Sequence, residues 1–221
     1  MFRKIFIMLA ILIAATASMT QAKSSDYEEI SRLVTWERQS RVRHLYDELA
    51  NCYFPDATVT TSWTKGSASA YLNNRNRLPE ASDDGTILVR FSPPIVHQYK
   101  SRAYAELPIT TTRHVKVNGE EAVLTSFMRL IYSVERRNGI WKIADLNSIN
   151  EDDTLESLIP GTDLHIDSNE LQKFRASYRF LAYVRVKAGG NVSDDLLGID
   201  RPEEIDRVYH DAEEWIHQSK N

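Results

Sequence analysis

The chain has 221 residues, of which 42% are hydrophobic and 26% charged, a composition typical of a globular domain and unlike that of a disordered or collagen-like chain. Lysine and arginine total 27 against 31 acidic residues, a formal net charge of −4, so bulk charge does not favour nucleic acid as a partner. Cys52 is the single cysteine, which excludes an intramolecular disulfide and any all-cysteine zinc or iron–sulfur site.

The N-terminus has the pattern of an export signal. Arg3 and Lys4 precede eleven apolar residues, Ile5 to Ala15, and a small and polar stretch ends at Ala22. Eleven residues rise only about 16 Å as a helix, which is too short for a bilayer core of about 30 Å. We therefore expect residues 1–22 to be a signal peptide cleaved after Ala22, and the mature protein to be periplasmic or secreted, with no attachment to a membrane.

Helical patterns open the mature chain. Ser25 and Glu28 form a capping box, and apolar residues continue from it at helical spacing. A second apolar set extends the helical region through Tyr53, until Pro55 and Asp56 break it. We expect a strand over residues 57–63 and a short helix over residues 67–77 to follow.

From Ile87 onward the hydrophobic pattern changes to period two. Strands are expected at 87–91 and 95–99, on either side of two prolines, and three longer runs follow at 102–117, 122–136 and 140–150. Asn-Gly pairs separate the three runs, and Asn-Gly is the strongest short-range signal for a two-residue hairpin turn.

The two Asn-Gly turns predict the strand register. The first turn places Ala105 opposite Tyr132 on a mostly apolar face. The second places Asp145 opposite Tyr132, and Asn147 opposite Leu130, on that same face. Three polar groups are therefore expected on an apolar surface.

After residue 150 the pattern turns helical again, from Leu171 to Leu181 and from Pro202 onward. Helices first, then a curved antiparallel sheet, then two more helices predict an α+β domain. We expect a domain over residues 23–165 and a helical extension over residues 166–221 packed on it.

This order, together with several stretches of sequence, resembles the SnoaL-like branch of the nuclear transport factor 2-like superfamily over about residues 26–218. The stretches are residues 46–59, Ser62-Trp63 with Gly66, Phe91-Ser92-Pro93-Pro94, residues 132–143 and residues 175–182. The resemblance implies a cone, in which a strongly curved antiparallel sheet wraps around a pocket closed by N-terminal helices. Members include polyketide cyclases and scytalone dehydratase, which typically use no metal or organic cofactor, and domains that only bind or dimerise.

The resemblance also implies two acid–base positions. Dehydratase relatives usually have an aspartate four residues before the aromatic residue that Tyr46 represents, and a histidine on the strand that leads into the Ser92-Pro93-Pro94 segment. Val42 and Val89 occupy these positions here. A local shift would recruit His44 or His97 instead, and that alternative stays open.

Asp145 and Tyr132 are the candidate catalytic residues, with Asn147 beside them. A carboxylate in an apolar pocket loses hydration, so its pKa rises and it can act as a general base, while a tyrosine hydroxyl can donate to a developing oxyanion. The alternative is a purely structural role, in which Asp145 hydrogen-bonds Tyr132 or pairs with Arg113.

Aromatic residues are candidates for the walls of a binding site. Trp36, Tyr46 and Trp63 could contact a flat apolar ligand, and His97 could lie at the rim. His210, Glu214 and His217 have a spacing that could hold a metal, but an exposed helical face is the better interpretation. No metal or cofactor is expected.

These observations predict an exported protein that binds a small, largely apolar organic molecule. One alternative is a cofactor-independent dehydratase, isomerase or cyclase that uses acid–base chemistry. The other is an interaction module that forms a homodimer through the outer sheet face carrying Thr110, Thr112 and Phe127.

Overall fold

The computed structural model describes residues 25–62, 64–73 and 87–218. The predicted signal peptide, Trp63 and the end of the helix expected at 67–77 lie outside these residues. Within the described ranges, every helix is too short or too polar to cross a membrane.

Among the described residues, three helices precede most of the sheet: α2 (Asp26–Val42), α3 (Tyr46–Asn51) and α4 (Ala68–Asn73). The predicted capping box is present, since the Glu28 backbone N–H donates to the Ser25 hydroxyl at 3.3 Å and the Ser25 N–H donates to the Glu28 carboxylate at 2.9 Å. The helical region ends earlier than expected, because Tyr53 begins strand β1 (Tyr53–Thr60), which contains Pro55.

In the described part of the chain, seven strands form one curved sheet in the order β2-β1-β7-β6-β5-β3, with β4 also paired to β5. The remaining strands are β2 (Lys65–Ser67), β3 (Ile87–Phe91), β4 (Ile95–Tyr99), β5 (Arg102–Val117), β6 (Glu120–Arg137) and β7 (Ile140–Ser157). The sheet is antiparallel except that β1 runs parallel to β7. Strand β7 runs seven residues past the predicted end at residue 150.

Both Asn-Gly pairs form the predicted turns. Asn118 and Asn138 adopt φ values of 53° and 52°, and the glycines after them also have positive φ, as a tight hairpin requires. The register of β5 with β6 is confirmed throughout, with Ala105 opposite Tyr132.

The register predicted for β6 with β7 holds only next to the turn. Val134 lies opposite Ile143, but the pairing then shifts by one residue at a β-bulge, so Asp145 lies opposite Ser133 and Asn147 opposite Ile131. Because successive side chains of a strand point to opposite faces, a shift of one residue exchanges the faces. The prediction that Asp145 and Asn147 share a face with Tyr132 is wrong.

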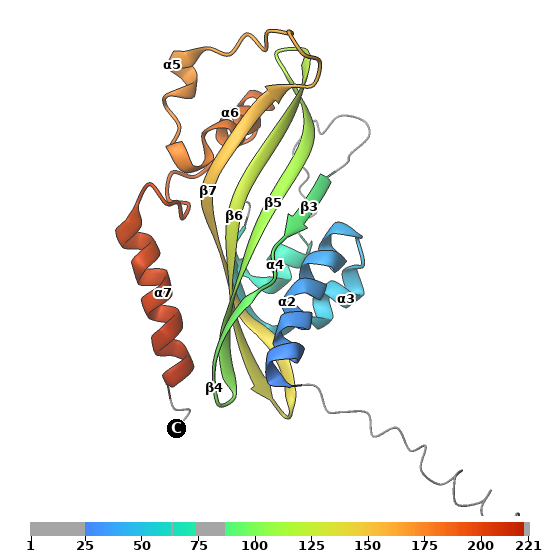
Figure 1. Ribbon diagram of the computed structural model, residues 1–221, viewed down its shortest axis with the longest axis vertical. Coiled ribbons are helices and arrows are strands. Elements are labelled where there is room, and N and C mark those ends of the chain that lie inside the picture. Colours follow the sequence, from blue (N-terminus) through green and yellow to red (C-terminus); the bar gives the residue numbers. More distant parts are fainter. Residues whose placement is uncertain (1–24, 63, 74–86, 219–221) are drawn as a thin grey trace, which may run out of the picture.

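Helices cover both faces of the sheet (Figure 1). The inner face carries Leu107, Leu130 and Tyr132 and packs against α2, α3 and α4. Farther along the strands, the same face carries Val115 and Leu124 and packs against α6 (Arg179–Lys187). The outer face carries Tyr104, Ile131 and Ile149 and packs against α7 (Pro202–His217). The single helical pattern expected from Leu171 to Leu181 is divided into α5 (Ser168–Leu171), a 3₁₀ turn (Ala176–Tyr178) and α6.

Polar contacts hold α7 on the outer face. The Tyr209 hydroxyl donates to Glu106 at 2.6 Å and accepts from Arg129 at 2.7 Å. The part of the outer face that carries Thr110, Thr112 and Phe127 lies beyond these contacts, and 37% of the Phe127 surface is exposed. The homodimer expected through this part stays a prediction.

A buried carboxylate attaches α6 to the sheet. Asp153 on β7 is 4% exposed and accepts hydrogen bonds from the backbone N–H groups of Phe180 and Leu181, at 3.1 and 2.7 Å. These groups lie in the first turn of α6, where backbone donors have no partner within the helix. Burial raises the pKa of Asp153 from 3.8 to about 6, although both hydrogen bonds favour the charged form.

Asp153 should therefore make stability depend on pH. Its pKa is higher in the folded protein than in the unfolded chain, so its stabilising contribution is full below about pH 4 and is lost as the pH rises through about 6. Between these values the free energy of unfolding of the wild type should fall by about 1–2 kcal/mol relative to Asp153→Asn. Urea titrations of both proteins across this range measure the difference.

The matched control is Asp206→Asn, which changes an exposed aspartate of α7. Its unfolding free energy should follow that of the wild type at every pH. A constant offset between the wild type and Asp153→Asn would contradict the role assigned to Asp153.

Candidate functional site

Glu37 is a fully buried carboxylate between α2 and the inner face of the sheet. It lies on the stripe of α2 that also buries Ile30 and Val34, so helix periodicity points it inward. Its oxygens accept hydrogen bonds from Tyr132 at 2.8 Å, Tyr53 at 3.0 Å and Tyr71 at 3.4 Å.

Arg38 supplies the counter-charge. Its guanidinium donates to Glu37 at 2.9 Å and to the Tyr71 hydroxyl at 2.9 Å. Burial alone would lower the pKa of Arg38, but the Glu37 carboxylate raises it well above its ordinary value. Glu37, Arg38, Tyr53, Tyr71 and Tyr132 are hereafter the Glu37 network.

The tyrosines of the network remain hydrogen-bond donors. Burial, and next the charge of Glu37, raise the pKa of Tyr132 and Tyr53 well above their ordinary value. Tyr132, Tyr53 and Tyr71 are each no more than 3% exposed. Packed side chains joined by hydrogen bonds therefore occupy the part of the cone where the sequence led us to expect an apolar pocket, although Nε of Arg38 is buried without a partner among the described residues.

Asp145 and Asn147 lie on the other side of the sheet. Asp145 accepts from the Thr58 hydroxyl and from the Asn147 amide, the latter at 2.5 Å. Burial raises the pKa of Asp145, and these hydrogen bonds oppose the rise. The partners expected for Asp145, Tyr132 or Arg113, are replaced by its neighbours on β1 and β7. Catalytic roles for Asp145 and Tyr132 stay predictions, but the shared face on which they were based does not exist.

The other predicted binding residues do not converge. Trp36 packs against the core under α2. Tyr46 is exposed and lies 3.2 Å from His44, which follows α2. His97 stacks on the ring of Tyr104 at 4.5 Å, on the outer face. Within the described part of the chain, therefore, these side chains do not share one pocket.

No group of metal-binding side chains occurs among the described residues. His210 pairs with Glu214 at 3.3 Å, and His217 pairs with Glu213 at 3.3 Å. All four side chains are more than half exposed, as expected for a solvated helical face.

A groove of about 590 Å³ opens between the C-terminal turn of α2 and β3. Its volume lies within the range of about 300–1,000 Å³ that is typical of ligand sites. The described residues that line the groove are Gln39, Val42, Arg43, Val89, Arg90 and Phe91.

The groove unites the two positions that the family resemblance singled out. Val42 and Val89 are 47 residues apart in the chain, and both line it. Neither His44 nor His97 is a lining residue, so the alternative in which a local shift brings them to these positions is not supported. Pairing of β3 with β5 sets this arrangement, because it holds Val89 opposite Thr111 at the edge of the inner face.

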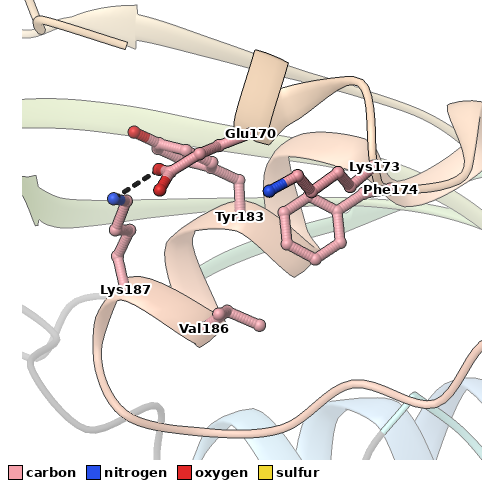
Figure 2. Close-up of a pocket in the computed structure, with 6 residues that line it drawn as sticks. All are labelled: Glu170, Lys173, Phe174, Tyr183, Val186 and Lys187. Atoms are coloured by element: carbon pink, nitrogen blue, oxygen red, sulfur yellow. Dashed lines mark ion pairs between the residues drawn. The ribbon is translucent and has the colours of Figure 1, made fainter. Parts of the chain in front are cut away.

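A smaller hollow of about 160 Å³ lies between α5 and α6 (Figure 2). Its walls include Phe174, Tyr183 and Val186, and an ion pair of 2.5 Å joins Lys187 to Glu170 beside it. This hollow is below the volume typical of ligand sites, so the groove is the better candidate.

Glu37 and the groove arginines were not among the residues predicted from the sequence. A signal for Glu37 was present, since it continues the spacing of Ile30 and Val34 on the buried stripe of α2. No comparable signal exists for Arg43 and Arg90, because only the pairing of β3 with β5 brings them to one groove.

We predict that Glu37→Gln lowers the free energy of unfolding by about 3–5 kcal/mol, because it leaves Arg38 buried without its counter-charge. The glutamine keeps the shape, but only its carbonyl oxygen can accept, so the amide nitrogen also takes away an acceptor that a tyrosine uses in the wild type. Urea denaturation measures the loss, with Glu48→Gln on the exposed surface of α3 as the control.

Equal stability of Glu37→Gln and the wild type would contradict this role of the network. If Glu37→Gln does not fold, Tyr132→Phe removes only one donor and should cost about 1–2 kcal/mol.

No family model matches the chain. Pea pathogenicity protein 2 of Fusarium vanettenii is 24% identical over 181 residues, which are 77% of this chain and 77% of that protein. Among solved structures, a type 2 hexachlorocyclohexane dehydrochlorinase, LinA, is 17% identical with a TM-score of 0.51, over 63% of this chain and 94% of that one. A nuclear transport factor 2-like superfamily protein of Salmonella enterica is 17% identical with a TM-score of 0.44, over 55% of this chain and 88% of that one.

The likeness to LinA and the sheet topology confirm the predicted fold. The chain has the nuclear transport factor 2-like cone, an α+β fold with a curved sheet, helices before it and helices after it.

Proposed function

We propose that this protein binds a small organic molecule with an apolar body in the groove between α2 and β3. The observation that carries the proposal is that Val42 and Val89, at the two positions where dehydratase relatives usually have their acid–base pair, line one groove. Apolar side chains therefore stand in this groove at the two positions where proton carriers are expected.

The described lining favours binding over acid–base catalysis. Valine, phenylalanine, glutamine and arginine do not exchange protons near neutral pH, so none of the six lining residues can act as a general acid or base. Glu37 is the nearest buried carboxylate on α2, but it is 0% exposed and its oxygens are occupied by tyrosines and Arg38.

The apolar character of the ligand is supported by Val42, Val89 and Phe91, which offer hydrocarbon surface to a bound molecule. The cone is also the fold of LinA, which is named as a hexachlorocyclohexane dehydrochlorinase.

The test is to fill the groove. N-phenyl-1-naphthylamine, a neutral aromatic probe that fluoresces in apolar surroundings, should bind the wild type, and Val89→Trp should weaken binding about tenfold or more by occupying the space. Fluorescence titration measures the affinity.

Val186→Trp is the matched control, because it adds the same side chain to the hollow beside α6. It should leave the affinity unchanged. The proposal fails if the wild type does not bind the probe, or if Val89→Trp binds it as tightly as the wild type does.

We also propose that the protein acts after export. The basic start, the apolar run from Ile5 to Ala15 and the small residue at Ala22 support this proposal. Full-length protein expressed in a Gram-negative host should be recovered from the periplasm with Lys23 as its first residue, as determined by intact mass. Recovery of an uncleaved chain from the cytoplasm would contradict export.

A further inference from the structure

The groove is positively charged although the chain as a whole is acidic. Of the six described residues that line it, two are Arg43 and Arg90 and none is acidic, whereas the formal net charge of the chain is −4. Within the described chain, neither of these two arginines forms an ion pair. Arg43 directly follows the last residue of α2 and Arg90 belongs to β3, so the two arginines line the groove from opposite sides.

A second group of arginines lies behind the groove. Arg113 is opposite Ile87 on β5, two residues along β3 from the lining residue Val89. Burial, and next the charges of Arg41 and Arg185, lower the pKa of Arg113 to about 10. Arg113 and Arg185 have further interactions of their own, so they contribute to the local field but are not assigned to the ligand.

Apolar side chains complete the groove. Val42 and Val89 lie on its two walls, on α2 and β3, and Phe91 extends the β3 wall. Gln39 adds an amide that can both donate and accept. The groove is thus lined both by hydrocarbon side chains and by two arginines.

We propose that the ligand of this groove is an organic anion, with a carboxylate or sulfonate group held by Arg43 and Arg90 and an apolar body against Val42, Val89 and Phe91. The inference rests on the proposed function, because it specifies the class of molecule that the same groove binds. Guanidinium groups suit such anions, since charge-assisted hydrogen bonds are about twice as strong as neutral ones.

Two matched probes test the charge separately from the apolar body. The probe 1-anilinonaphthalene-8-sulfonate has the same aromatic body as N-phenyl-1-naphthylamine and adds a sulfonate. The wild type should bind the sulfonate about tenfold or more tightly than the neutral probe, as expected from a hydrogen bond to a charged group.

The variant Arg43→Gln/Arg90→Gln should lose about tenfold or more of its affinity for the sulfonate and keep its affinity for the neutral probe. High salt should weaken binding of the sulfonate by the wild type, because exposed charges are screened. The matched control is Arg32→Gln, which removes an exposed arginine of α2 that does not line the groove.

The outcomes separate the two proposals. If both probes bind with similar affinity and the double variant changes neither, the anion inference is wrong while the groove remains a binding site. If the wild type does not bind the neutral probe, or if Val89→Trp binds it as tightly as the wild type does, the proposed function itself fails. Equal loss of sulfonate binding in Arg32→Gln would show that only the general surface charge matters, and would also overturn the inference.

Discussion

The Glu37 carboxylate is the interaction on which the inner layer of this protein depends. It is fully buried, and its oxygens accept hydrogen bonds from tyrosines of β1, α4 and β6. A carboxylate in such surroundings is tolerated only because Arg38 neutralises it and the tyrosines satisfy its lone pairs. The position of α2 against the sheet is thereby defined by direction-dependent contacts and not by apolar packing alone.

This constraint bears on the site. The network occupies the inner face of the sheet beneath α2, and the groove that we propose for the ligand lies beyond it, where the end of the helix meets β3. Arg41, one turn beyond Glu37, lies over the ring of Tyr71 at 3.8 Å and connects the network to the arginines near the groove. Successive turns of α2 therefore contact the buried network and then the groove.

Much of the fold could be predicted from local sequence signals. The capping box at Ser25, both Asn-Gly turns and Pro202 at the start of α7 each act over a few residues, and the structure has all of them. The register of β5 with β6 follows from the turn alone, since no bulge interrupts it. The predicted ends of helices and strands were wrong where strand pairing overrides local propensity. Tyr53, for example, belongs to β1 and pairs with β7.

The site could not be predicted in the same way. A bulge has no signature in this sequence, so the face occupied by Asp145 could not be known from the turn at Asn138. The groove is made by α2 and β3, whose mutual position depends on the Glu37 network and on the pairing of β3 with β5. Such long-range arrangements depend on tertiary packing, so they could not be predicted from the spacing of residues along the chain.

The bulge after Ile143 has a wider consequence for chains of this architecture. One additional backbone unit in β7 assigns Leu146 to the core and leaves the acid and the amide on the side toward α7. Consider two proteins with the same turn and the same segment, of which only one has the additional residue. One would place the acid and the amide inside the cone, and the other would place them on the outer face. Alignment of relatives around residue 144 should accordingly be judged by strand geometry, because one gap placed wrongly transfers an acid from one wall of the sheet to the other.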